Sequence, residues 1–136
     1  MSGSKAYSVK RTPRFERSLR ELIRSAFPKS DPPERLMHGL GVIFDLLQSD
    51  PRHEAFCKPE PAKHLGVPAG CELWKVRFDL PGVRGALGAA RFVYLICEER
   101  REVILVWAYS HKQFAKRPPH RDMKKAIREI AKLFDG

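Results

Sequence analysis

Two basic residues, Lys75 and Arg77, stand two positions apart in a segment where apolar and polar residues alternate. Because successive side chains of a β-strand point to opposite faces, both cations would project from one face, about 7 Å apart. Arg91 lies in a second alternating segment, and we expect it to join them in one concave, exposed patch. Three such cations could bind phosphates and stabilise developing negative charge. The alternative is that they are solvated charges on an open face of an antiparallel sheet.

A histidine and a lysine, His111 and Lys112, follow the last apolar segment before the C-terminal region. A histidine beside lysines has its pKa lowered and can exchange a proton near neutral pH. We therefore place one of the two at the edge of the cationic patch; the alternative is that His111 is a surface residue without a role. The sequence contains no glycine-rich phosphate loop, metal-ligand cluster or nucleophile elbow. We accordingly expect neither a metal nor a cofactor.

Positive charge is concentrated in two parts of the chain, whose net charge is +10. Residues 1–29 hold eight Lys and Arg against two acids, and residues 111–128 hold seven against one, whereas residues 30–74 are net acidic. Polyanions favour clustered cations because binding releases counterions, so the pattern favours a nucleic-acid partner. A solvated basic surface is the alternative. The cations that we expect to bind RNA are Arg14, Arg17, Lys116, Arg117 and Arg121.

Two helices are predicted in the first third of the chain, after a short strand at residues 7–10. Thr12 and Pro13 are typical of a helix start, because a hydroxyl N-cap is followed by proline at the first helical position. A capping-box-like pattern at residues 31–34 predicts the second helix. The prolines between the two predict an antiparallel helical hairpin. Residues 52–70 hold several prolines and glycines and are predicted to form an irregular loop.

The spacing of the apolar residues then changes from a helical period to a period of two. Three strands are predicted at residues 73–79, 90–97 and 103–109, and a final helix follows Pro119. A charged turn at residues 98–101 predicts that the last two strands pair as an antiparallel hairpin. The residues that we expect to be mostly buried are Phe15, Leu19, Leu22, Leu40, Phe44, Trp74, Val76, Phe92 and Tyr94.

These elements predict one α+β domain over residues 1–136, in the order β-α-α-β-β-β-α. It would be a small antiparallel sheet with an N-terminal helical hairpin packed on one face and a C-terminal helix. Residues 1–5 are expected to be a disordered tail. No apolar run approaches the roughly 20 residues of a membrane span, and the start lacks a signal-peptide core, so we expect a cytoplasmic protein without membrane contact. Cys57, Cys71 and Cys97 are expected to remain reduced thiols.

The order of these elements, together with four short motifs, resembles the RelE/ParE superfamily of toxins. Residues 73–78, Leu-Trp-Lys-Val-Arg-Phe, are similar to that family's strand of the form aromatic-basic-apolar-basic. Residues 89–94, Ala-Ala-Arg-Phe-Val-Tyr, resemble its G-x-R-h-x-Y strand, and residues 103–112 resemble its hydrophobic last strand that ends in a polar-Lys pair. Residues 12–15, Thr-Pro-Arg-Phe, are similar to the opening of its first helix. The resemblance covers most of residues 6–130.

The resemblance implies the toxin half of a type II toxin–antitoxin system, of the RelE or HigB-like branch. Such a toxin would cut mRNA in the ribosomal A site without a metal or small-molecule cofactor, and a cognate antitoxin protein would neutralise it. Lys75, Arg77 and Arg91 would activate the ribose 2′-OH and offset charge on the phosphate. His111 or Lys112 would protonate the leaving oxygen. The alternatives are a non-catalytic, ParE-like inhibitor of DNA gyrase and a basic RNA-binding module derived from such a toxin.

The antitoxin is expected to be an acidic or amphipathic segment that orders on binding. It would lie along the sheet or across a cationic helix face, with aliphatic anchors against exposed positions such as Leu73. That helix face consists of Arg14, Arg17, Arg20 and Arg24. Nucleases of the family often keep a tyrosine or histidine shortly after the last strand. This chain has Phe114 in that region, and Tyr109, inside the strand, is the tyrosine that lies near.

Overall fold

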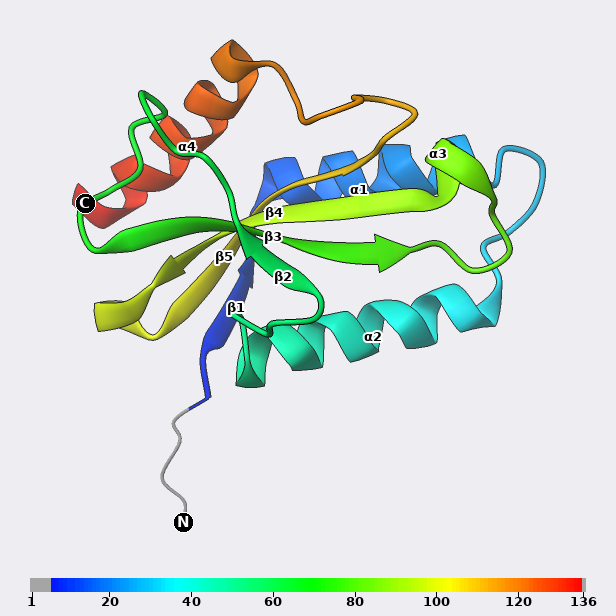
Figure 1. Cartoon of the computed structure of the whole chain (residues 1–136), viewed down its shortest axis with the longest axis horizontal. Coiled ribbons are helices and arrows are strands. Elements are labelled where there is room, and N and C mark those ends of the chain that lie inside the picture. Colours follow the sequence, from blue (N-terminus) through cyan, green and yellow to red (C-terminus); the bar gives the residue numbers. More distant parts are fainter. Residues whose placement is uncertain (1–5, 136) are drawn as a thin grey trace.

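The computed structural model describes residues 6–135, so the expected tail at residues 1–5 lies outside the described residues. Its centre is a five-stranded sheet in the order β1-β5-β4-β3-β2 (Figure 1). β1 pairs with β5 in parallel, and the other three pairings are antiparallel, as expected for the three long strands. The strands are β1 (Ser8–Arg11), β2 (Cys57–Pro59), β3 (Cys71–Asp79), β4 (Ala89–Cys97) and β5 (Glu102–Ser110).

Within residues 6–135, three long α-helices and one short one accompany the sheet. The helix start at Thr12 is confirmed, because the Thr12 hydroxyl accepts a hydrogen bond from the backbone N–H of Phe15 at 3.1 Å. The second helix begins at Glu34 as predicted, but none of the described side chains caps it, so the expected capping box is wrong. No helix within residues 6–135 is long and apolar enough to cross a bilayer. The helices are α1 (Pro13–Ala26), α2 (Glu34–Ser49), α3 (Gly85–Gly88) and α4 (His120–Asp135).

One face of the sheet packs against α1 and α2, which confirms the predicted placement of the N-terminal helices. At the centre of this core, the rings of Phe15 and Phe92 meet edge to face with centroids 5.2 Å apart. Trp74 and Phe44 are half-buried at its margin, and the other residues expected in the core are buried. Since Lys75 lies on the opposite face from Trp74, the predicted register of β3 is confirmed.

The other face of the sheet is not open, because α4 and part of the loop before β3 cover it (Figure 1). Met123, Ile127 and Ile130 of α4 pack there against apolar residues of β4 and β5. Leu73 belongs to this second core and is only 3% exposed. The expectation that Leu73 is an exposed anchor for a partner is therefore wrong, because α4 and the loop before β3, whose positions the sequence did not predict, cover it.

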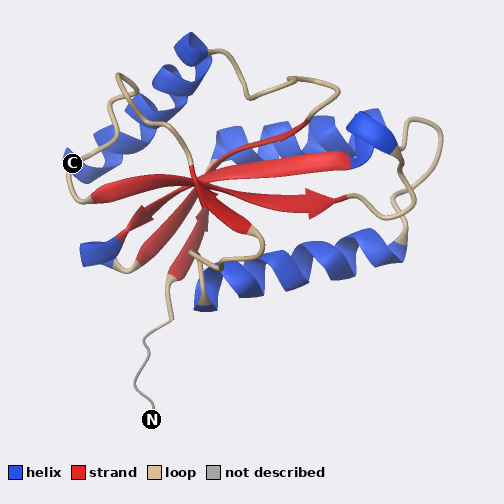
Figure 2. Ribbon diagram, viewed as in Figure 1, coloured by secondary structure: helices blue, strands red, loops and turns tan. Residues whose placement is uncertain are grey.

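Two segments outside the predicted helices and strands contain regular structure, which Figure 2 shows. Within the segment 52–70, residues Cys57–Pro59 form β2, whose Cys57 lies opposite Val76 at the edge of the sheet. Between β3 and β4, residues Gly85–Gly88 form the single turn of α3. The order of the larger elements is therefore β-α-α-β-β-α-β-β-α rather than β-α-α-β-β-β-α.

Two of the three cysteines face each other across neighbouring strands. Cys71 begins β3 and Cys97 ends β4, and the two are directly opposed in the sheet with their Cα atoms 4.3 Å apart. They form a disulfide, so the expectation that all three thiols stay reduced is wrong for this pair. Cys57 is a buried thiol, and burial raises its pKa.

Candidate functional site

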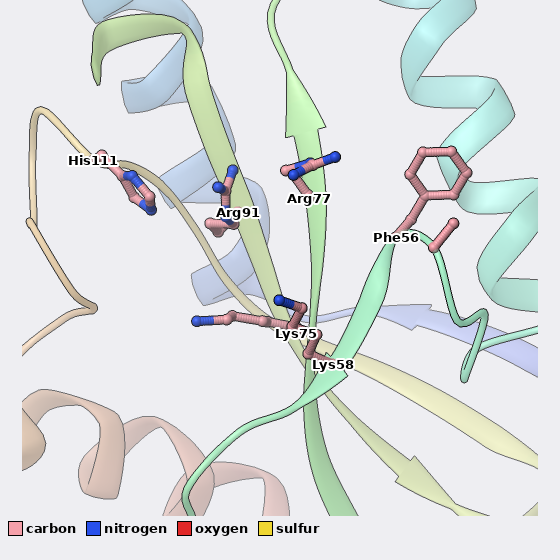
Figure 3. Close-up of a pocket in the computed structure, with 7 residues that line it drawn as sticks. Phe56, Lys58, Lys75, Arg77, Arg91 and His111 are labelled. Carbon is pink, nitrogen blue, oxygen red and sulfur yellow. The ribbon is translucent and has the colours of Figure 1, made fainter. Parts of the chain in front are cut away.

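A pocket of 180 Å³ opens on the sheet face that α4 covers elsewhere, and the predicted cations line it (Figure 3). Lys75 and Arg77 come from β3, Arg91 comes from β4, and His111 follows β5. The structure therefore brings together four of the five residues predicted to do chemistry. The side chains that line this cationic pocket also include Phe56 and Lys58, from the edge of the sheet.

The pairing of the strands places like charges directly opposite each other. Arg77 lies opposite Arg91, and Lys58 lies opposite Lys75. In an antiparallel pair of strands, opposed residues alternate between pairs that exchange backbone hydrogen bonds and pairs that do not. The N–H of Leu80 donates to Gly88 O at 2.8 Å, so Leu80 and Gly88 are a hydrogen-bonded pair. Three positions along, Arg77 and Arg91 are therefore a pair without mutual backbone hydrogen bonds, the type in which side chains stand closest. Like charges in such pairs destabilise a sheet by about 0.2–1 kcal/mol. The opposition of Arg77 and Arg91 therefore does not stabilise the fold, whereas an anionic ligand bound between the two guanidinium groups would relieve their repulsion.

Burial and the neighbouring Arg77 lower the pKa of Arg91, although Asp79 opposes the shift. An arginine nevertheless remains charged at neutral pH. Arg91 is half-buried and its guanidinium donates to the carbonyl of Ala90 at 2.7 Å, which orients it. The pocket thus holds a fixed, partly desolvated positive charge beside the exposed Arg77. In such surroundings a cation stabilises a phosphate more strongly than it does in water.

Lys75 is held in place by a buried carboxylate, Glu60, which the sequence did not single out. The Lys75 ammonium lies 3.0 Å from one oxygen of Glu60, and the Arg117 guanidinium lies 2.9 Å from the other. Glu60 is 8% exposed, and its backbone N–H donates to Leu73 O at 2.9 Å, which continues the pairing beyond β2. Glu60 therefore positions Lys75 at the pocket. The only sign of Glu60 in the sequence is that it lies two residues after Lys58, the spacing that places two side chains on the same face of a strand.

His111 lies at the edge of the cationic pocket, as predicted, and burial together with Arg91 and Lys75 lowers its pKa. The direction of this shift was predicted, but the cationic neighbours that cause it lie across the sheet rather than beside it in sequence. The backbone N–H of His111 donates to Ala89 O at 3.0 Å, which fixes its position beside β4. Lys112 is exposed and is not among the residues that line the pocket. Of the two predicted proton donors, the pocket contains His111.

Tyr109 lies directly opposite Arg91, but its hydroxyl is already engaged. It donates to the carbonyl of Lys116 at 2.8 Å, and its ring meets Phe114 edge to face at 6.1 Å. Burial raises the pKa of Tyr109 to about 12. This tyrosine therefore holds the segment after β5 against the sheet, and it is poorly suited to exchange protons near neutral pH.

The five cations expected to bind RNA lie outside the cationic pocket. Arg14 forms an ion pair with Glu129 of α4 at 2.8 Å, and it lowers the pKa of that carboxyl. Arg117 pairs with Glu60, and one of its nitrogens also donates to Pro61 O at 2.6 Å. The cations with exposed side chains among the five are Arg17, Lys116 and Arg121. A role for any of the five in RNA binding remains a prediction.

Within the described part of the chain, no group of three or more His, Cys, Asp and Glu side chains could hold a metal ion. The residues that line the cationic pocket can bind an anion, stabilise added negative charge, and transfer a proton through His111. Phe56 and Lys58, which the sequence analysis assigned to an irregular loop, complete the pocket from the side of β2 (Figure 3).

No protein-family model matches the chain, and no curated protein matches it. Among solved structures, the chain is similar to a double arginine-to-alanine mutant of the E. coli toxin RelE in the free state. The similarity covers 92% of this chain and 98% of that chain, with 16% sequence identity and a TM-score of 0.46. We base the function on the residues of the pocket.

Proposed function

We propose that this chain is a toxin that cleaves mRNA on the ribosome and that a cognate antitoxin silences it in the cytoplasm. The observation that supports this most directly is the cationic pocket, in which Lys58 lies opposite Lys75 and Arg77 lies opposite Arg91, beside a histidine. Arrangements that cost stability persist where a ligand offsets the cost, and four cations in one pocket select for phosphate. RNA also carries its own nucleophile, so a protein that positions and neutralises charge can suffice.

In the proposed reaction, the ribose 2′-oxygen attacks the adjacent phosphorus and the bond to the 5′-oxygen breaks. The products are a 2′,3′-cyclic phosphate and a free 5′-hydroxyl. Arg77 and Arg91 neutralise the two non-bridging oxygens, on which charge accumulates in the transition state. The ammonium group of Lys75, which Glu60 holds in place, or that of Lys58 donates the proton that the leaving 5′-oxygen takes up.

His111 is assigned to proton transfer because of where it lies and how its pKa is shifted. A pKa below the ordinary value keeps the imidazole mostly neutral at pH 7, which favours accepting the proton of the 2′-OH. The sequence had suggested a proton donor at this position. The burial and the cationic neighbours of His111 favour the opposite role.

The antitoxin is assigned to a groove of 220 Å³ between α1 and α4. Val106, Ile130 and Leu133 give this groove an apolar lining, and Arg17 lies on its rim. An amphipathic acidic segment suits such a surface, because it can bury aliphatic side chains while it pairs with exposed cations. Arg14 is already paired with Glu129, so the cationic helix face offers fewer unengaged charges than the sequence suggested.

The test is a reconstituted translation reaction to which the purified chain is added. We expect translation to stop and the mRNA to be cut, with 2′,3′-cyclic phosphate ends, while DNA supercoiling by gyrase is unaffected. Arg91→Ala should lose about 100-fold in cleavage rate, and it should not melt at a lower temperature than the unmodified chain. If the chain leaves mRNA intact and blocks supercoiling, the nuclease function is refuted and inhibition of gyrase takes its place.

The antitoxin is tested by co-expression with the neighbouring reading frame. We expect a small acidic protein that co-purifies with this chain and relieves its toxicity. Arg17→Glu should weaken the complex, while Lys29→Glu, an equal change of charge in the exposed loop before α2, should leave it intact. A neighbouring product that neither binds nor relieves toxicity would refute the antitoxin.

A further inference from the structure

A second hollow adjoins the cationic pocket at the edge of the sheet. Its volume is 390 Å³, and it runs between α2 and the end of β3. Its apolar wall includes Val42 and Phe56, which are 52% and 46% exposed and are among the most exposed large apolar side chains of the described residues. The side chains that define this edge groove are Val42, Leu46, Phe56, Arg77, Phe78 and Asp79.

The edge groove and the cationic pocket are adjacent, because Phe56 and Arg77 line both. The backbone N–H of Arg77 donates to Phe56 O at 3.0 Å, so the two residues are neighbours across β3 and the start of β2. Figure 3 shows the ring of Phe56 on the α2 side of Arg77, while Arg91 and His111 lie on the other side. A ligand that reaches across Arg77 would place an anionic part among the cations and a second part beside the Phe56 ring.

The ring of Phe56 is supported from behind. His53 lies against it with ring centroids 5.1 Å apart and an interplanar angle of 31°, and the His53 ring accepts a hydrogen bond from Ala55 N–H at 3.1 Å. An aromatic side chain that is exposed yet held in position suits a flat partner, because stacking then requires little further ordering. Aromatic residues beside basic grooves are the usual platform for the bases of single-stranded nucleic acid.

We infer that the edge groove binds a nucleobase of the RNA strand, next to the phosphate that the cationic pocket holds. This inference rests on the proposed nuclease function and adds a base-binding subsite to it. Phe56 stacks on the base, and Val42 and Phe78 enclose its apolar faces. Arg77 lies at the junction, where it contacts the phosphate that connects this nucleotide to the pocket.

Asp79 gives the groove a preference among bases. An ionised carboxylate only accepts hydrogen bonds, so it favours a base edge with an exocyclic amino group over one with a carbonyl. Cytosine and uracil differ at position 4 of this edge, where cytosine carries an amino group and uracil carries an oxygen, and we place the Asp79 carboxylate opposite that position rather than opposite the N3–H of uracil. The groove therefore prefers cytosine, and other amino-bearing bases, to uracil.

The edge groove also resembles a docking site for an apolar peptide, but its charges favour the nucleotide. A peptide would leave Asp79 and Arg77 without a specific role, whereas a nucleotide uses the first for its base edge and the second for its phosphate. The edge groove also lies next to the four cations of the cationic pocket, which favours a ligand whose apolar base and anionic phosphate belong to the same nucleotide.

The experiment uses 2′-O-methyl trinucleotides, which lack the nucleophile and cannot be cleaved through the 2′-oxygen. Calorimetry on the full chain compares a cytosine trimer, a uracil trimer and an abasic sugar–phosphate trimer. We expect the cytosine trimer to bind at least about fivefold more tightly than the uracil trimer. Phe56→Ala should weaken the cytosine trimer by about 5- to 150-fold and leave the abasic trimer unchanged. Asp79→Asn should reduce the preference for cytosine over uracil.

Met37→Ala is the matched control, because Met37 is an exposed apolar residue of α2 that does not line the groove. Its binding of all three trimers should equal that of the unmodified chain. Phe56→Leu, which keeps an apolar side chain but not a flat one, should bind as Phe56→Ala does, and thermal unfolding checks that both variants fold. The base-binding subsite is refuted if Phe56→Ala binds the cytosine trimer as tightly as the unmodified chain does, or if the abasic trimer binds as tightly as the other two. Base-dependent binding through Phe56 without mRNA cleavage would sustain the subsite and refute the nuclease.

Discussion

Replacing Arg77 by alanine should stabilise the fold while it removes activity. Arg77 and Arg91 are directly opposed in a pair of the closer type, and the truncation relieves their repulsion. An opposed like-charge pair costs about 0.2–1 kcal/mol, and the exposure of Arg77 keeps the gain within that range. For a chain of this length, we expect the melting temperature to rise by about 1–5 °C. Cleavage of mRNA should fall by about 100-fold in the same variant.

The electrostatic origin of this gain can be separated from other effects by salt. The Debye length falls from about 30 Å at 0.01 M salt to about 3 Å at 1 M, so a gain that arises from repulsion shrinks as salt increases. Thermal unfolding followed by circular dichroism at both salt concentrations measures it. A double-mutant cycle with Arg91→Ala should also show that the second truncation gains less than the first.

Lys29→Ala is the control for the loss of one positive charge, because Lys29 is exposed in the loop between α1 and α2. It should change the melting temperature less than Arg77→Ala does and leave cleavage intact. An Arg77→Ala chain that melts more than 2 °C lower at low salt would refute the idea that repulsion in the pocket opposes folding. A gain that is the same at both salt concentrations would refute its electrostatic cause.

Three further predictions follow from single contacts. Glu60→Gln should destabilise the chain by about 1–3 kcal/mol and slow cleavage about tenfold, because it weakens the ion pairs with Lys75 and Arg117. An unchanged free energy of unfolding in denaturant would contradict the bridging role of Glu60. For His111, the lowered pKa means that its protonation costs stability as pH falls below 6.5; cleavage should rise with pH to a plateau near neutral, and His111→Gln should flatten this rise. A His111→Gln chain with the original pH profile would rule out that proton transfer. Thr12→Ala should cost about 1–2 kcal/mol in thermal unfolding, because the hydroxyl caps α1 and also donates to Leu105 O at 2.8 Å; Ser8→Ala, exposed on β1, should cost little.

The elements with a strong local signal could be predicted from the sequence. Thr12 and Pro13 begin a helix wherever they precede an amphipathic segment, and the structure has the cap that they predict. The long strands were predictable because each is a run rich in β-branched and aromatic residues, and the alternation along β3 also placed Lys75 and Arg77 on the same face. The membership of Lys75, Arg77 and Arg91 in one pocket therefore followed from residue types and spacing.

The parts that were missed depend on contacts between distant segments. β2 is three residues long and contains Pro59, so it exists because it pairs with the exposed edge of β3. Glu60 is informative only once β2 is placed, since its partner Lys75 is distant in sequence. The Cys71–Cys97 disulfide likewise depends on the register of two strands across 26 residues. No local pattern encodes these pairings.

The position of His111 depends on an irregularity in β5 that sequence patterns cannot reveal. Val93 pairs with Trp107 and Tyr94 with Leu105, so one residue of β5, Val106, has no counterpart in β4. Strict alternation would place Tyr109 with Leu105, on the face that packs against α1 and α2. The extra residue reverses the later positions, so Tyr109 joins the opposite core and lies across from Arg91. His111 follows Tyr109 by two residues and its N–H bonds to Ala89, so it shares the face of the cations. Because β5 is apolar on both faces, hydrophobic alternation fits either arrangement equally well. The bulge, rather than the alternation, brings His111 to the face that carries the cationic pocket.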